Sequence, residues 1–341
     1  MTDSKPGTAF NHFRGTARTL WRSVVLAGFA LIAFGGIAVS LVKGAVNIPL
    51  YDIAQAVAGN GAGVQGQIIW NIRLPRTLVG ALVGLNLALS GAILQAVMKN
   101  PLADPHIIGI SSGAGLAGII VLVLLPNMEY LLTPAAFAGA LAAASLIYLL
   151  AWKGGIRPIR IILAGVAVSA FLGSGISALL VLYGDRVHGA LMWMVGGLTA
   201  RSWPHFQVVL PYSVCGGLLA FLGARQLNVL SLGDEVARGL GLRVELTRIV
   251  LTAVAALLAA SAVSVAGLLG FVGLIVPHAA RLLIGSDYRF LLPASALLGA
   301  GVVTLSDTLA RTLFSPVEIP VGILMAFIGA PFFLFLLRRE A

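Results

Sequence analysis

Long apolar runs recur along this chain, and no other feature limits its fold as strongly. A run of about 18 or more apolar residues can cross the hydrocarbon core of a bilayer as a helix, whereas a barrel strand needs only about ten residues. Only 10% of the 341 residues are charged, compared with about 25% in soluble proteins. The sequence therefore predicts an all-α polytopic membrane protein with a single transmembrane domain over residues 1–341.

Ten transmembrane helices account for the apolar runs. Their predicted limits are 20–42, 72–98, 106–125, 134–152, 159–183, 204–224, 246–266, 268–284, 291–312 and 320–338. The seventh and eighth are divided only by the stretch Gly267-Leu268-Leu269-Gly270, and without that division the C-terminus would change sides. Residues 1–19 are expected to form a cytoplasmic tail.

The distribution of basic residues tests this topology. With a cytoplasmic N-terminus, sixteen of the 22 lysines and arginines fall on the cytoplasmic side, as the positive-inside rule requires. Both termini are therefore predicted to be cytoplasmic. The net charge of +10 then reflects orientation in the membrane, and we expect no nucleic-acid partner.

Motifs of enzyme chemistry are missing from the sequence. It contains no Gly-x-x-x-x-Gly-Lys-Ser/Thr loop for a nucleotide, and its five histidines lack the spacing of a metal site. We expect no catalytic residues, no cofactor and no metal site. A transport function is left, and one alternative within it is an ion-coupled secondary transporter, which needs ionisable groups inside the bundle. Asp307 is the clearest carboxylate of that kind.

A charged segment at 229–243 separates two apolar runs on the predicted cytoplasmic side. It is expected to form short helices broken at Gly233, Gly239 and Gly241. Its apolar residues recur every four positions, a spacing that favours docking into a partner's groove, although a solvated loop is an equal alternative. The candidate contact residues are Leu232, Gly233, Asp234, Glu235, Ala237, Arg238, Leu240 and Gly241.

Three of the arginines on the predicted outer side are candidates for a docking site, because the charge rule disfavours cations there. Arg73 and Arg76 share one face of a helix start, and Arg311 lies near the outer end of the ninth helix. They could extend toward the interface as an ordinary cationic pair or dock a partner's carboxylates. Asp307, four residues before Arg311, could also pair with it locally.

Polar residues and breaks inside the apolar runs mark a possible pathway. The candidates are Asn86, Ser90, Gln95, Asn100, Pro101, Gly273, Pro277 and His278. Polar side chains in such positions either line a pathway or hydrogen-bond between helices, and sequence does not separate the two. His278 could relay protons or simply pack at a helix end.

Five collinear motifs resemble the permease subunits of type II ATP-binding-cassette importers for iron-siderophores, haem and vitamin B12, the FecCD/BtuC-like family. The motifs are Arg73-Leu74-Pro75-Arg76, Asn100-Pro101-Leu102-Ala103-Asp104-Pro105 with Gly109-Ile110-Ser111-Ser112-Gly113-Ala114, Leu232-Gly233-Asp234-Glu235-Val236-Ala237 with Leu240-Gly241, Gly270-Phe271-Val272-Gly273 with Pro277-His278 and Arg281, and Pro320-Val321-Gly322 with Gly329-Ala330-Pro331-Phe332. They cover roughly residues 50–338.

The resemblance implies a multi-pass protein of the bacterial cytoplasmic (inner) membrane. Two such subunits, as a homodimer or a heterodimer, would form the pathway, with two cytoplasmic ABC ATPases below and an extracytoplasmic substrate-binding protein above. Segment 229–241 would be the coupling helices that contact the ATPases, and Arg73, Arg76 and Arg311 would dock the binding protein. The subunit itself would not hydrolyse ATP. Ferric siderophore is the first expectation for the substrate, and haem or vitamin B12 the alternative.

Overall fold

The computed structural model describes residues 7–44, 48–58, 63–106, 109–153 and 158–340, and the regular secondary structure in these ranges is helical. The helices are α1 (Gly7–Val42), α2 (Leu50–Val57), α3 (Gly63–Ile68), α4 (Leu74–Met98), α5 (Ile110–Leu124), α6 (Leu132–Ala151), α7 (Pro158–Leu182), α8 (Val187–Val195), α9 (Trp203–Leu222), α10 (Ala224–Ser231), α11 (Asp234–Gly239), α12 (Val244–Ala266), α13 (Val272–Ile284), α14 (Tyr288–Thr312) and α15 (Val321–Glu340). A π-helical turn, η1 (Ile69–Arg73), leads into α4, and short 3-10 turns lie at Pro126–Leu131 and Gly184–Arg186.

Each of the ten apolar runs contains a helix in the described ranges. By length and composition, seven helical stretches in the described ranges could cross a membrane, namely Arg18–Val42, Gly63–Met98, Pro126–Ala151, Pro158–Leu182, Trp203–Leu222, Val244–Ala266 and Tyr288–Thr312. Three more apolar helices, α5, α13 and the Val321–Phe335 part of α15, are shorter. The chain is therefore a helical membrane protein.

Two predicted boundaries can be compared with the helices. The break at Gly267–Gly270 is confirmed, because α12 ends at Ala266 and α13 starts only at Val272. Gly267 supports it with a φ of 72°, a left-handed conformation that side chains with a Cβ rarely adopt. At the other end, α1 begins at Gly7, so most of the predicted 1–19 tail is helical, and residues 1–6 lie outside the described part.

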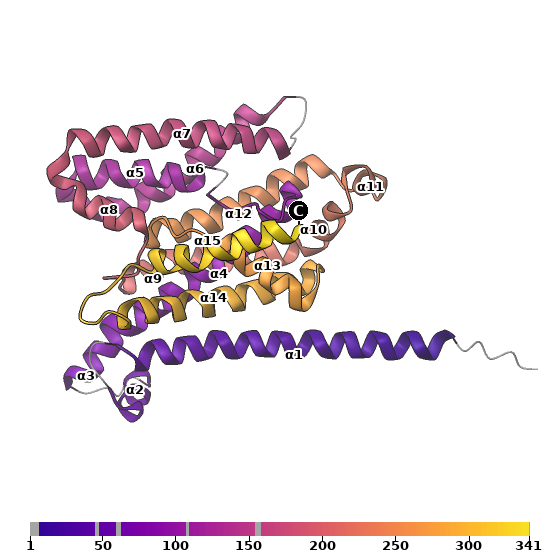
Figure 1. Ribbon diagram of the computed structural model, residues 1–341, viewed down its shortest axis with the longest axis horizontal. Coiled ribbons are helices and arrows are strands. Elements are labelled where there is room, and N and C mark those ends of the chain that lie inside the picture. The colour runs from indigo at the N-terminus through magenta and orange to yellow at the C-terminus, as the bar shows by residue number, and fades with distance from the viewer. Residues whose placement is uncertain (1–6, 45–47, 59–62, 107–108, 154–157, 341) are drawn as a thin grey trace, which may run out of the picture.

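Helix α4 lies at the centre of the bundle, packed against α9, α12, α13 and α14, while α1 packs on α14 (Figure 1). Most of its side chains are buried. Two glycine pairs bring its backbone onto its neighbours: a Cβ at Gly84 would overlap the carbonyl oxygen of Gly299, and one at Gly91 would overlap that of Gly273. Close backbone approach through small residues is how membrane helices pack without a hydrophobic driving force.

A second layer of α5, α6 and α7 covers one side of this core, joined to it mainly through α12 (Figure 1). Here small residues again let two helices approach closely, since Gly113 of α5 lies against Gly139 of α6.

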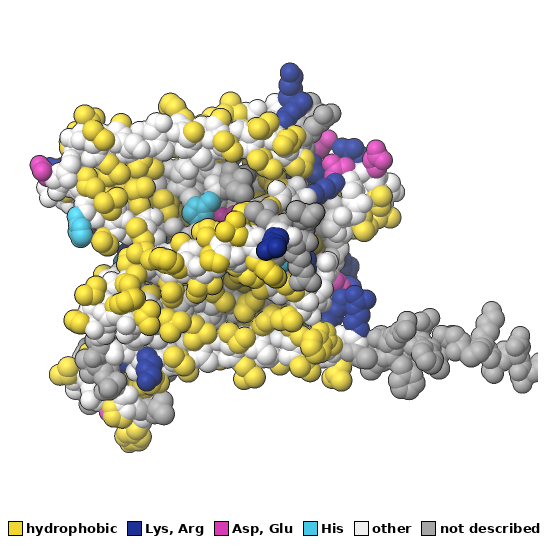
Figure 2. Space-filling view, viewed as in Figure 1, with side chains coloured by type: hydrophobic (Ala, Val, Ile, Leu, Met, Phe, Trp, Pro, Cys, Tyr) yellow, Lys and Arg dark blue, Asp and Glu magenta, His cyan; other side chains and the backbone are white. Residues whose placement is uncertain are grey.

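The two ends of the bundle differ in chemistry. Charged side chains gather around α10 and α11, and apolar side chains cover the visible flank between the ends (Figure 2). Helices α2 and α3 lie at the opposite end (Figure 1). We call these the α11 end and the α2 end.

Candidate functional site

Arg73 caps the C-terminal end of α1. The residue completes the π-helical turn η1, and its Nη1 donates hydrogen bonds to the carbonyl oxygens of Leu41, at 2.7 Å, and Val42, at 2.9 Å. These carbonyls belong to the last turn of α1, where a cation is favourable because the helix dipole places negative charge there. Gly44 leaves room for the guanidinium, since a Cβ there would lie 2.7 Å from Arg73 Nη2.

Arg76 is held by two carboxylates of its own chain. Its Nε and Nη2 each donate to the carboxylate of Asp307 in α14 at 2.9 Å, and its Nη1 donates to Glu318 Oε2 at 2.9 Å. Such a bidentate contact is the stronger form of an arginine–carboxylate pair. The mutual repulsion expected between Arg73 and Arg76 is thus balanced inside the subunit, before any partner is present.

Arg311 binds the end of α1 rather than Asp307. Its Nη2 donates to the carbonyl oxygen of Ser40 and to Ser40 Oγ, which lies 2.7 Å from Thr77 Oγ1 of α4. The local pairing of Asp307 with Arg311 is therefore wrong as an ion pair: the carboxylate turns to Arg76, where two donors can reach it at once.

All three arginines of this cluster are buried within the single subunit, with 4% of Arg73 and 7% each of Arg76 and Arg311 exposed. The structure does bring them together at the α2 end, joining α1, α4 and α14. Three guanidinium groups face two carboxylates, so the cluster keeps one net positive charge. Their docking role stays a prediction.

The charged segment at the α11 end is folded. Helix α10 ends at Ser231, Gly233 turns the chain with a φ of 111°, and α11 follows directly. The predicted breaks at Gly233 and Gly241 are confirmed by positive φ angles, and α11 ends at Gly239, the third predicted break.

One face of this segment is apolar and open. Leu232, Val236 and Leu240 are 60%, 51% and 63% exposed, while Ala237 is fully buried against the bundle. Charged residues surround the face, and Arg238 pairs with Glu245 at 3.6 Å. Exposed apolar side chains rimmed by charge are typical of an interaction surface. The solvated-loop alternative does not account for this pattern.

Asp234 ties the segment to the bundle. Its Oδ1 accepts a hydrogen bond from Lys99 Nζ at the end of α4, at 2.6 Å, and another from Arg248 Nη2 of α12, at 3.0 Å. Burial would raise the pKa of this carboxyl, but the Lys99 hydrogen bond and the Arg248 charge outweigh it and lower the pKa. Asp234 is thus ionised at neutral pH and holds α11 to two core helices.

The polar residues inside α4 bond between helices. Asn86 Nδ2 donates to Ser213 Oγ of α9 and Ser261 Oγ of α12, and Ser90 Oγ donates to the carbonyl oxygen of Ala255. Gln95 Oε1 accepts from Arg281 Nη2 of α13 at 2.9 Å. In this chain they therefore tie α4 to its neighbours.

The connection after α4, which contains Asn100 and Pro101, lies against the start of α13. Asn100 Oδ1 accepts from Leu102 N across Pro101, and a Cβ on Gly273 would lie 3.0 Å from Oδ2 of Asp104 in the same connection. Pro277 lies inside α13. The His278 ring is 8% exposed and stands edge-on to Phe332 of α15, with 6.2 Å between ring centroids.

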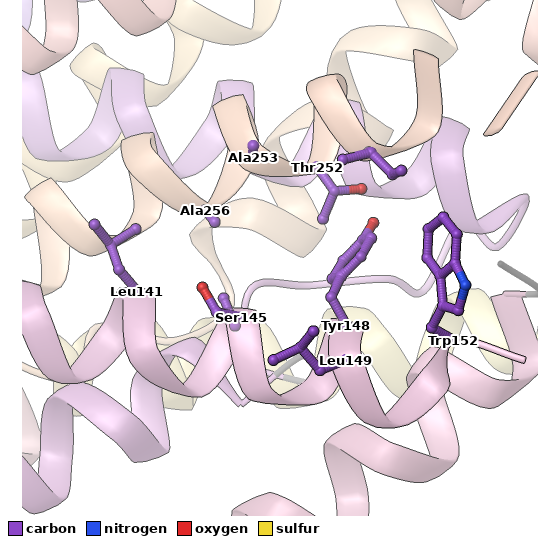
Figure 3. A pocket seen from close by; sticks show the side chains of 10 residues that line it. Leu141, Ser145, Tyr148, Leu149, Trp152, Thr252, Ala253 and Ala256 are labelled. Atoms are coloured by element: carbon purple, nitrogen blue, oxygen red, sulfur yellow. The ribbon is translucent and has the colours of Figure 1, made fainter. Parts of the chain in front are cut away.

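A groove of about 410 Å³ opens between α6 and α12. Figure 3 shows the hydroxyls of Tyr148 and Thr252 facing each other across it, with Trp152 at one side. Ser145 and several alanine, leucine and isoleucine side chains form the rest of its walls, which are mainly apolar, as suits a membrane-facing surface. Within the described residues no three His, Cys, Asp or Glu side chains gather around a common metal position.

The sequence identified the three arginines of the cluster but not the residues that bind them. Ser40 and Glu318 had no visible role, because the contacts join segments 271 and 242 residues apart. Lys99 was visible only as one of many inner cations, although its place just after α4 in a left-handed C-cap conformation points it at α11.

Comparison with known proteins gives a consistent picture. The family model of the FecCD transport family matches residues 30–339. The Fe(3+)-citrate import permease YfmD of Bacillus subtilis is 42% identical over 311 residues, covering 91% of this chain and 93% of YfmD. The cobalamin import permease BtuC of Halobacterium salinarum is 46% identical over 305 residues, covering 88% and 82%.

A third relative is the hemin transport permease HmuU of Yersinia pestis, 42% identical over 279 residues, covering 80% of this chain and 84% of HmuU. A solved metal-chelate type ABC transporter in an inward-facing conformation superposes with a TM-score of 0.83 at 30% identity, covering 93% of this chain and 99% of that one. With a helical membrane bundle and a match over nearly its whole length, the chain belongs to the FecCD transport family of ABC importer permeases.

Proposed function

We propose that this chain is one of two permease subunits, identical or paired with a close relative, in an ATP-driven importer of the bacterial inner membrane. Ten helices cross the membrane, with both termini and the α11 end in the cytoplasm and the α2 end outside. Among the described apolar helices of ten or more residues, five precede α9 and five run from α9 onward, which supports an even number of crossings. The charged residues at the α11 end support its cytoplasmic side (Figure 2).

The observation that carries this proposal is the α10–α11 segment. Its exposed Leu232, Val236 and Leu240 form an apolar contact face for an ATPase subunit, and Asp234 connects the same segment to α4 and α12. When ATP draws two ATPases together, a rigid-body shift of α11 is transferred through these ion pairs to the helices of the core. Gly233, Glu235, Arg238 and Gly241 belong to the same surface.

At the α2 end the arginine cluster docks an extracytoplasmic binding protein. Reversing Arg73 and Arg76 to glutamate would destroy the α1 cap and the Asp307 pair as well as any docking. A cleaner test is the exchange Arg76→Asp with Asp307→Arg, which keeps the internal pair and moves its charges. We expect weaker pull-down of the binding protein with ATPase attachment unchanged, and no effect from Arg338→Gln at the other end. Unchanged pull-down by the exchanged pair would reject docking.

For the substrate we propose a ferric siderophore or a similar iron(III) chelate. Support comes from relatives named for Fe(3+)-citrate, at 42% identity, and for Fe(3+)-hydroxamate, at 39%. Cobalamin is the second candidate, favoured by the relative at 46% identity, and hemin the third. Along the pathway, Asn86, Ser90 and Gln95 of α4 and Gly273, Pro277 and His278 of α13 are the proposed gating elements, together with the Asn100-Pro101 turn.

The deciding experiment is reconstitution in proteoliposomes. The permease, its ATPase and its binding protein are combined, and uptake of the chelate bound by that protein is measured with and without ATP. We expect uptake only with all components and ATP. Uptake by the chain alone, driven by an ion gradient, would instead establish a secondary transporter. Pairing of Asp307 with Arg76 argues against that alternative, since the carboxylate is already neutralised.

A further inference from the structure

A second, partly buried cation lies at the α2 end, outside the arginine cluster. Arg201 belongs to the connection 196–202 between α8 and α9. Its Nη1 lies 3.3 Å from His205 Nε2, and its buried Nε has no hydrogen-bond partner among the described residues. The ion pairs formed by described residues do not include it. Burial lowers the pKa of Arg201 to about 10. A buried donor without an acceptor is unfavourable, so the site around the Arg201 guanidinium is incomplete.

Arg201 lines a cavity of about 370 Å³ together with Trp193, Thr199 and Glu318. Trp193 is 6% exposed, and its Nε1 is also buried without a described hydrogen-bond partner. Indole and guanidinium nitrogens donate hydrogen bonds and cannot accept them. Glu318, on the same wall, already accepts from Arg76 at 2.9 Å. A group that complements this cavity therefore carries acceptors and negative charge.

The connection that carries Arg201 is fixed in place. Gly197 N donates to the carbonyl oxygen of Ala266 at 2.8 Å, and Gly322 N donates to that of Gly196 at 3.0 Å. The ends of α12 and α15 thus clamp the loop from two sides. A cation on a clamped backbone is positioned before its ligand arrives, which lowers the ordering entropy that binding must overcome.

We propose that this cavity is a substrate subsite, in which Arg201 is the counter-ion for a carboxylate of an anionic metal chelate on its way into the pathway. The inference rests on the proposed import function and narrows its substrate class. A cavity of about 370 Å³ lies at the small end of ligand sites, which span about 300–1,000 Å³. It holds a compact carboxylate chelate, or one carboxylate arm of a larger one.

Direct binding tests the subsite. The permease–ATPase complex in lipid nanodiscs is dialysed to equilibrium against radioactive gallium(III) citrate, a redox-inert carboxylate chelate. We expect Arg201→Gln to weaken its binding about tenfold or more, the effect of removing a charge-assisted hydrogen bond. Arg201→Lys retains the charge and should recover part of the affinity. Arg186→Gln removes a cation of the neighbouring α7–α8 turn, outside the cavity lining, and serves as the matched control.

Two further probes separate the sources of negative charge. A gallium trihydroxamate without free carboxylates should bind no more weakly to Arg201→Gln than to the wild type. Inorganic phosphate in millimolar excess should not displace gallium citrate. The proposal is overturned if wild type does not bind gallium citrate, if Arg201→Gln binds it equally well, or if phosphate displaces it as a general anion.

Uptake measurements distinguish failure of the Arg201 subsite from failure of the proposed import function. If wild-type proteoliposomes show no ATP-driven uptake of any chelate, the import function fails. If wild type imports a chelate and Arg201→Gln imports carboxylate chelates with unchanged KM, only the subsite fails. A raised KM for carboxylate chelates alone supports it.

Discussion

Replacing Asp307 by asparagine is expected to lower the free energy of unfolding by about 3 kcal/mol. The side chains of Arg76 and Asp307 are 8% and 3% exposed, and two 2.9 Å hydrogen bonds join them. Asparagine keeps the shape but removes the charge and one acceptor. Removal of one partner from a buried pair has an effect of about 3–5 kcal/mol, and we take the lower value because Glu318 still accepts from Arg76.

The assay is reversible unfolding in mixed detergent micelles, followed by the helical signal in circular dichroism. Glu318→Gln is the matched control, since it removes a carboxylate from the same arginine. The Glu318 side chain is 40% exposed, so water screens its interaction with Arg76 and the expected effect is below about 1 kcal/mol.

A double variant tests whether charge, rather than shape, is responsible. Arg76→Met with Asp307→Leu removes both charges and fills the site with apolar atoms. We expect this pair to regain most of the stability lost by Asp307→Asn, because no uncompensated charge is left buried. The reasoning is refuted if Asp307→Asn is no more destabilising than Glu318→Gln, or if the double variant is less stable than Asp307→Asn.

Three predictions concern other parts of the bundle. The hydrogen bond from Lys99 and the charge of Arg248 lower the pKa of Asp234, so its ion pair stabilises the fold above a pH of about 4. This stability is lost as the pH falls through the lowered pKa, and Asp234→Asn should remove that acid-dependent loss from the thermal stability of the purified subunit. Leu240→Asp should abolish ATPase co-purification while leaving the thermal stability of the subunit unchanged, since Leu240 is exposed; intact co-purification would contradict the contact face. Gly299→Ala should destabilise the bundle by about 1–3 kcal/mol because its Cβ would overlap the α4 backbone, whereas Gly173→Ala, with open space around it, should have no such effect in the same unfolding assay.

Helix positions were largely predictable from the sequence, because membrane helices are selected by length and apolarity, both of which are local properties. The end of α12 at Ala266 and the turn at Gly233 followed from glycines in the printed chain. Gly239 likewise marks the last residue of α11, as expected for a residue with low helix propensity.

Partners of the buried charges were not predictable. Asp307 and Arg311 lie four residues apart on one helix, so local spacing favoured their pairing. The carboxylate instead meets Arg76, 231 residues away, because α4 and α14 pack closely through Gly84 and Gly299. Such a choice depends on which helices are neighbours, and a single sequence carries no record of that.

One consequence of the central helix concerns the distance over which a signal travels. Helix α4 has 25 residues and is about 37 Å long at 1.5 Å per residue. Near its start Arg76 pairs with Asp307 of α14, and just past its other end Lys99 pairs with Asp234 of α11. Under the proposed function, a displacement of α11 would therefore be carried by one continuous helix to the arginine cluster at the α2 end. Between these two ends, Gly84 and Gly91 set the α4 backbone directly against those of α14 and α13, so these helices are the neighbours that such a displacement would meet first.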